Sequence, residues 1–158
     1  MSAMPEPESA HREAGRWEEW LQFILEDQSY GINVLQIQEI LYGGLIEPVP
    51  GAPSHVLGVI NLRGSIVTVI DTRMRLGLPS LEPGDKEWII VLDVLDETIG
   101  LLVDEVMEVQ VINPDTIEKM AADMSGREPH VAGVMEIPNV GMLILLDAAS
   151  VSGLKREA

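Results

Sequence analysis

The chain of 158 residues contains no cysteine, which excludes disulfides, thiolate metal sites and thiol nucleophiles. Aromatic residues are scarce, with three tryptophans, two tyrosines and one phenylalanine. A nucleic-acid stacking platform needs several aromatics interleaved with bases on one face, and that pattern is missing. Bases are also few, since 10 lysines and arginines stand against 26 acids for a net charge of −16. Such acidity either keeps a small protein soluble or favours basic partners, and it repels nucleic acid and anionic lipid.

Long apolar runs are absent too. Met142–Leu146 is far too short to span a bilayer, and Met1–Gly15 lacks the apolar core of a signal peptide. We therefore expect a soluble, cytoplasmic protein with no direct membrane insertion. Its length fits one domain, or two small lobes that share a core, between short tails at 1–16 and 155–158.

The second half of the chain repeats the pattern of the first. The motif Gly31-Ile32-x-Val34-x-x-Ile37-x-Glu39-Ile40 recurs as Gly100-Leu101-x-Val103-x-x-Val106-x-Glu108-Val109. His55-Val56-x-Gly58-Val59 likewise returns as His130-Val131-x-Gly133-Val134. We interpret this as a duplicated unit of about five short strands. The prediction is one domain at 17–154, with lobe one at 17–78, a connector at 79–87 and lobe two at 88–154.

Short strands separated by turn signals predict an all-β fold of two five-stranded barrels packed on each other. The clearest hairpin joins Val56–Leu62 to Ile66–Ile70 through a turn at Arg63-Gly64-Ser65. Leu35–Leu41 is ambiguous between helix and strand. Short helices are expected at Thr72–Leu76 and, with Asp147 as N-cap, at Asp147–Leu154.

Three arginines in the first half, Arg63, Arg73 and Arg75, have no basic counterpart in the second half. The duplicated fold therefore does not demand them. We expect Arg63 to pair with Glu39, either as a structural strut or as the edge of an interaction groove. In the second case Ile37, Val106 and Val109 would form the apolar wall of the groove.

No pattern for catalysis is found. His55 follows a serine but its repeat partner His130 does not, and the histidines lack metal-ligand spacing. We expect no enzymatic activity, no metal and no cofactor. The alternative is a small-molecule-binding β domain, or a cryptic enzyme, that uses Glu39 and Arg63 on an anionic ligand. A deep enclosed pocket would favour this alternative, and an open groove would favour an adaptor.

Four stretches closely resemble the CheW family of bacterial chemotaxis adaptors: Tyr30-Gly31-Ile32, Val34-x-x-Ile37-x-Glu39-Ile40, Gly58-Val59-Ile60-Asn61-Leu62-Arg63-Gly64 and Val69-Ile70-Asp71. The similarity runs from about Trp20 to Leu154. The sequence departs from the family pattern at Thr68, where a proline is usual, and at Thr72, where a leucine is usual.

The resemblance implies two SH3-like barrels and a non-catalytic role in chemotaxis signal transduction. It implies two partners, the cytoplasmic tip of a methyl-accepting chemoreceptor and the regulatory domain of a CheA-type histidine kinase, at receptor arrays on the membrane. In that family a groove between the barrels takes the receptor's helical hairpin. The matching positions here are Val34, Ile37, Glu39, Gly58, Arg63, Gly100, Val106 and Val109.

Overall fold

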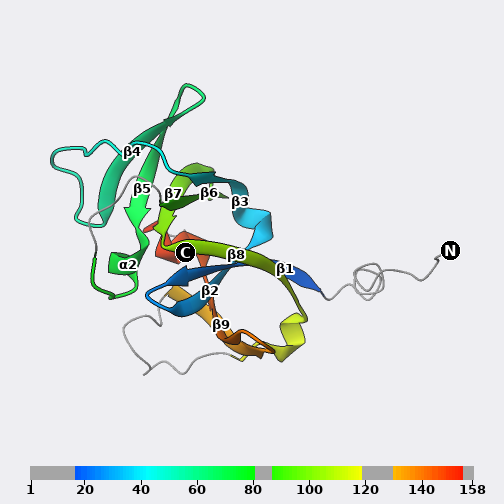
Figure 1. Ribbon diagram of the computed structural model, residues 1–158. Helices are drawn as coiled ribbons and strands as arrows, with labels where there is room; N and C mark the ends of the chain where they lie inside the picture. Colours follow the sequence, from blue (N-terminus) through cyan, green and yellow to red (C-terminus); the bar gives the residue numbers. More distant parts are fainter. Residues whose placement is uncertain (1–16, 81–86, 119–129, 155–158) are drawn as a thin grey trace.

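The computed structural model describes residues 17–80, 87–118 and 130–154, and the two predicted tails lie outside these ranges. Ten strands, two short α-helices and two 3-10 turns make up the described chain (Figure 1). In chain order they are β1 (Glu18–Leu25), β2 (Gln28–Asn33), η1 (Val34–Gln36), β3 (Ile37–Tyr42), β4 (Val56–Leu62), β5 (Ser65–Asp71), α2 (Thr72–Arg75), β6 (Trp88–Val94), β7 (Glu97–Val103), β8 (Glu105–Ile112), η2 (Pro114–Thr116), β9 (Val131–Ile137), β10 (Gly141–Leu146) and α3 (Ala148–Val151).

The strands form two five-stranded sheets, which confirms the predicted all-β fold with few short helices. One sheet has the order β8-β1-β2-β10-β9 and is called lobe A here. The other has the order β3-β6-β7-β5-β4 and is called lobe B. Most neighbouring strands are antiparallel, but β10 runs parallel to β2 and β5 runs parallel to β7. Each parallel pair joins one strand from each half of the chain.

The duplication is visible in the strand pairing. If β1 to β5 are matched in order with β6 to β10, the strand order of lobe A becomes that of lobe B. The registers match as well, since Gln22 pairs with Gly31 in one lobe and Val91 pairs with Gly100 in the other. The register shift between Leu21 and Phe23 in β1 has its equivalent in the β3–β6 pair. The two lobes are therefore related by a pseudo-two-fold repeat.

The predicted division into lobes at 17–78 and 88–154 is wrong. After β2 the chain crosses from lobe A to lobe B through η1, and after β7 it crosses back. Lobe A therefore contains β1 and β2 from the first half but β8, β9 and β10 from the second. The repeat in the sequence identifies equivalent strands, but it does not show which copy each strand pairs with.

In each sheet, one edge strand forms a backbone bridge with the segment that follows the other edge strand. In lobe B, Glu47 and Val59 exchange two backbone hydrogen bonds of 2.9 Å, and Glu118 and Val134 form the equivalent bridge in lobe A. Gly58 lies directly beneath the first bridge, where an added Cβ would be 2.2 Å from the carbonyl oxygen of Glu47. Only a residue without a side chain allows this approach.

The main hydrophobic core lies between the two sheets and takes buried side chains from both lobes, among them Phe23, Tyr30, Leu92 and Leu101. Two smaller cores lie inside the lobes. The one in lobe B is built around Val69 and Val91, and the one in lobe A contains Trp20. Burial of apolar side chains in the shared core holds the lobes together.

One short helix follows the last strand of each repeat. Asp71 caps α2 by accepting a hydrogen bond from the Met74 N–H at 3.1 Å, and Asp147 caps α3 through the Ser150 N–H at 3.1 Å. The predicted N-cap at Asp147 is confirmed, although α3 ends at Val151 rather than Leu154. The ambiguous stretch Leu35–Leu41 contains the end of η1 and most of β3.

Candidate functional site

Glu39 and Arg63 form the ion pair expected from the sequence. Arg63 occupies the β4–β5 turn with a positive φ of 52°, followed by Gly64 at 87°, and Glu39 lies on β3. The two guanidinium NH₂ groups donate to the two carboxylate oxygens at 2.5 and 3.1 Å. This bidentate bond raises the pKa of Arg63 above its usual value, chiefly because it is donated to a carboxylate.

The pair links opposite edges of lobe B, because β3 and β4 are the outermost strands of that sheet. It therefore acts as a second closure of the barrel beside the Glu47–Val59 bridge. The Arg63 side chain nevertheless remains 73% exposed, against 22% for Glu39. Its outer surface is thus open to another molecule while its inner edge holds Glu39.

The predicted apolar wall divides into two parts. Val34, Ile37 and Val106 are partly buried and pack against the core between the lobes. Val109, in contrast, is exposed on β8. Of the three residues predicted to form the wall, the structure therefore places Val109 on the surface and Ile37 and Val106 mainly in the seam between the lobes, together with the matched groove position Val34.

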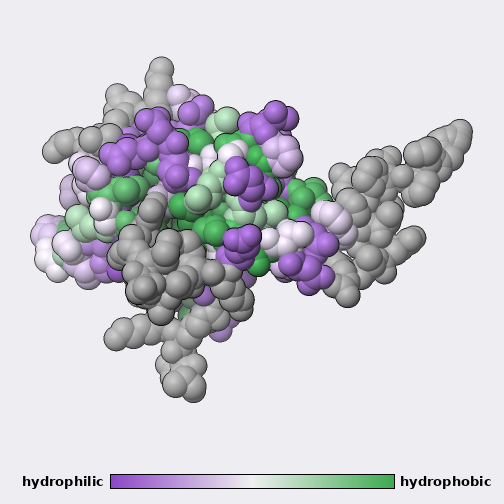
Figure 2. Space-filling model, turned by 90° about the horizontal axis from the view of Figure 1, so that it is seen from below, coloured by the Kyte–Doolittle hydropathy of each residue, from purple (hydrophilic) through white to green (hydrophobic). Residues whose placement is uncertain are grey.

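Further apolar residues are exposed on the same strands and were not singled out from the sequence. Every second residue of β8, from Met107 through Val109 to Val111, is exposed, as are Ile40 and Tyr42 on β3. The alternation along each strand was the available signal. Because β3 and β8 are edge strands, these rows lie at the borders of their sheets. Another face of the molecule shows hydrophobic side chains gathered in the middle and hydrophilic ones around them (Figure 2).

The two predicted glycines, Gly58 and Gly100, are buried. Gly58 permits the bridge to Glu47, and Gly100 lies on β7, where an added Cβ would be 2.8 Å from the Ile89 side chain. Gly31 holds the equivalent position in lobe A, where an added Cβ would be 3.0 Å from the Leu145 side chain. Close packing thus accounts for both glycines, and any effect on a partner would be indirect.

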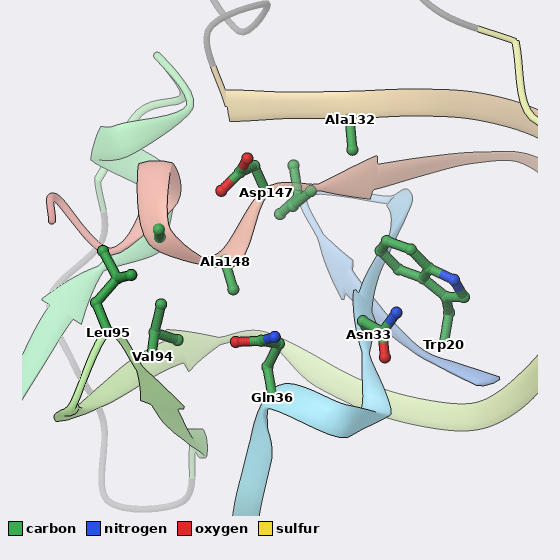
Figure 3. A pocket seen from close by; sticks show the side chains of 10 residues that line it. Trp20, Asn33, Gln36, Val94, Leu95, Ala132, Asp147 and Ala148 are labelled. Atoms are coloured by element: carbon green, nitrogen blue, oxygen red, sulfur yellow. The ribbon is translucent and has the colours of Figure 1, made fainter. Parts of the chain in front are cut away.

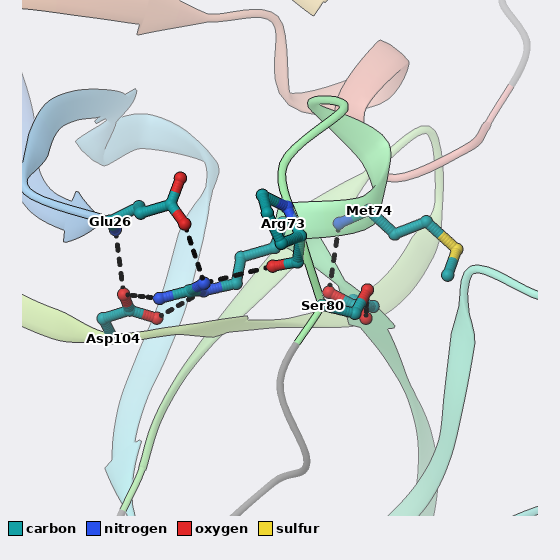
Figure 4. Close-up of polar contacts among 7 residues, drawn as sticks. Glu26, Arg73, Met74, Ser80 and Asp104 are labelled. Atoms are coloured by element: carbon teal, nitrogen blue, oxygen red, sulfur yellow. Dashed lines mark hydrogen bonds and ion pairs between the residues drawn. The ribbon is translucent and has the colours of Figure 1, made fainter.

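Arg73 has structural partners that tie the lobes together (Figure 4). Its guanidinium donates to both carboxylate oxygens of Asp104, at 3.1 and 2.5 Å, and lies 3.6 Å from the Glu26 carboxylate. A further bond of 3.1 Å goes to the Pro79 carbonyl. Burial alone would raise the pKa of Asp104, but bonds from Arg73 and the Glu26 N–H lower it below the usual value.

Arg75 makes a second contact between the lobes. It donates to the carbonyl oxygens of Ser150 and Val151 at 2.8 and 3.1 Å, at the end of α3. His55 and His130 lie nearby, and His130 Nδ1 is 2.7 Å from the Ser150 hydroxyl. Burial and, secondarily, the charge of Arg75 lower the pKa of both histidines, an effect that Asp147 partly offsets at His130.

No group of three or more potential metal ligands is found among residues 17–80, 87–118 and 130–154. Within the same ranges, none of the helices has the length and apolarity needed to cross a membrane.

The CheW-like domain family model matches residues 19–155. The chain belongs to the CheW-like family. It is 35% identical to the chemotaxis protein CheW of Rhizobium meliloti over 134 residues, which cover 84% of this chain and 86% of the relative. It is 37% identical to CheW of Bacillus subtilis over 101 residues, or 64% and 65% of the two chains.

A solved structure shares the CheW-like fold. The scaffolding protein TtCheW from Thermoanaerobacter tengcongensis superposes with a TM-score of 0.76 at 28% identity, over 82% of this chain and 88% of that one. The family resemblance seen in the sequence is thereby confirmed. Membership assigns the chain to chemotaxis scaffold and adaptor proteins.

Arg73 and Arg63 allow a test of which arginine is structural. The Arg73 side chain is 11% exposed and pairs with Asp104, so we expect Arg73→Ala to lower the free energy of unfolding by about 2 to 3 kcal/mol. The exposed Arg63→Ala serves as the matched control and should change stability far less. Urea unfolding of both variants measures the difference. Equal losses would show that Arg73 does not carry the contact between the lobes.

His55 and His130 should make the stability of the protein depend on pH. Because folding lowers the pKa of His55 and His130, the unfolded chain binds protons more readily below about pH 6.5. The free energy of unfolding should therefore be constant above about pH 7 and decrease as the pH falls towards 5. Urea unfolding across this range measures the slope, which should flatten in the double variant His55→Asn, His130→Asn. Greater stability at pH 5 than at pH 7 would contradict the assignment.

Proposed function

We propose that this CheW-like chain couples the signalling tips of chemoreceptors to the regulatory domain of a CheA-type histidine kinase, without catalysing a reaction itself. The observation that carries the proposal is the exposed Arg63, held in place by Glu39 on the same strand as the exposed Ile40 and Tyr42. A fixed charge beside an apolar strip suits the recognition of an amphipathic helix.

In this mechanism the apolar residues supply affinity and the charge sets orientation. A receptor helix would bury the exposed side chains of β3 and β8, including Val109, while Arg63 would meet an acceptor on the helix. The partly buried Val34, Ile37 and Val106 would support the surface from below. The net charge of −16 favours docking against a basic patch on the kinase.

The small-molecule alternative receives less support from the surroundings of Arg63. Both oxygens of Glu39 already accept hydrogen bonds from the guanidinium, so the paired face of Arg63 is not available to an anionic ligand. The hollow beside Arg63 is also lined by Asp96 and Glu97, which would repel an anionic ligand. The site would operate in the cytoplasm, at receptor arrays, with no nucleic acid involved.

A charge swap separates the structural role of the pair from a role in recognition. We expect Arg63→Ala to weaken binding of a purified receptor signalling tip by about tenfold, the effect of losing a charge-assisted bond. The double variant Arg63→Glu, Glu39→Arg should recover the thermal midpoint of the wild-type protein but not its receptor affinity.

Thermal unfolding and receptor titration of both single variants and the double variant provide the measurement. Recovery of both stability and binding in the double variant would remove Arg63 from the interface. Tight binding of a small anion that competes with the receptor tip would instead support the alternative function.

A further inference from the structure

A cavity of about 330 Å³ opens between the lobes on the side of α3. Its lining combines apolar side chains with polar groups and comes from both sheets. Trp20 of β1 and Ala132 of β9 lie on one side, and Val94 and Leu95 lie on the other, with Gln36 of η1 beneath (Figure 3). None of the lining residues is among those proposed to contact the receptor.

The pseudo-two-fold repeat makes this cavity equivalent to a site in the first repeat that a side chain fills. Ala149 is the second residue after the Asp147 cap, as Arg73 is the second residue after the Asp71 cap. In the first repeat the long Arg73 side chain occupies the space beside α2 and is 11% exposed. In the second repeat the alanine leaves the corresponding space empty, and the cavity lies there.

The residues that contact Arg73 are also replaced at the equivalent positions. Leu35 is equivalent to Asp104, and Leu95 in the β6–β7 turn is equivalent to Glu26 in the β1–β2 turn. The ion-pair partners of Arg73 are thus replaced by two leucines, which are 88% and 48% exposed. The site beside α3 therefore has neither the cation nor the two acids, and Leu95 lines the hollow instead. An exposed leucine at a concave site indicates contact with an apolar group.

We propose that this cavity receives one bulky apolar side chain, such as leucine, from a basic segment of a partner protein. The inserted side chain takes the place that Arg73 fills in the other repeat, with Leu95 beside it. Asp96 follows Leu95 in the turn, and Asp147 lines the cavity itself. Together with the net charge of −16, these acids favour basic residues on either side of the inserted side chain.

Binding of defined peptides to the full-length protein tests whether the cavity accepts a leucine side chain from a basic segment. The probes are blocked pentapeptides with a central leucine or alanine between pairs of lysines, and a third peptide with leucine between pairs of glutamates. We expect the leucine peptide with lysines to bind about tenfold more tightly than either of the others, since burial of the larger side chain supplies that difference. Amide NMR shifts should concentrate at Gln36, Leu95 and Ala149.

Two matched pairs of variants locate the binding. Ala132 and Glu136 are both exposed on β9, but only Ala132 lines the cavity, so Ala132→Phe should abolish binding and Glu136→Phe should not. Leu95→Ser should weaken binding, because Leu95 lines the cavity, whereas Leu45→Ser, at another exposed leucine, should not. Thermal unfolding verifies that each variant is folded.

Three results would overturn the proposal. They are equal binding of the leucine and alanine peptides, equal loss of binding in the two members of either variant pair, and no saturable binding of any peptide. Sedimentation provides a further check on the occupant. Self-association that Ala132→Phe abolishes would assign the cavity to a second copy of this chain, and would also overturn the proposal.

Discussion

The apolar core between the two sheets is the contact on which the rest of the structure depends. Its fully buried side chains come from both lobes, and Phe23 stacks on Tyr30 within it at a centroid distance of 5.9 Å. Each lobe has only a small core of its own, as expected for a barrel of this size, which is marginally stable alone. Because β3 to β5 and β8 to β10 are exchanged between the repeats, neither half can complete a lobe without the other.

Residues that shape the backbone recur in both repeats, whereas the arginines do not. Gly58 and Gly133 both lie beneath a backbone bridge from an edge strand, and Asp71 and Asp147 both cap a helix. The arginines break this symmetry, because Arg73 and Arg75 each bond across the junction from one repeat only. The candidate surfaces for partners occur where the repeats differ, at Arg63 on one side and at the cavity beside Ala149 on the other.

Much of the fold could be predicted from local signals in the sequence. Alternating apolar residues and turn residues predicted the β4–β5 hairpin and the duplicated strands, and Asp147 was predicted as the cap of the last helix. The exchange of strands could not be predicted in this way. Equivalent strands have the same burial pattern in either copy, so the sequence is compatible with both connections. Only the crossings after Asn33 and Val103 decide between them.

The candidate site could be predicted in part, and for similar reasons. The Glu39–Arg63 pair followed from two opposite charges in one repeat. The lack of basic counterparts in the second half also led to the prediction that the fold does not require Arg73 and Arg75, but both have structural partners across the junction. Their acceptors lie about 30 and 75 residues away in the chain, respectively. Contacts over such separations leave no local pattern.

Fragment complementation tests the strand exchange most directly. The chain would be produced as two separate pieces, residues 1–83 and 84–158, and each would be studied alone and mixed. The exchange predicts that neither piece gives a dispersed amide NMR spectrum alone, and that an equimolar mixture forms a one-to-one complex with the spectrum of the intact chain. A stable, folded five-stranded lobe formed by either piece on its own would contradict it.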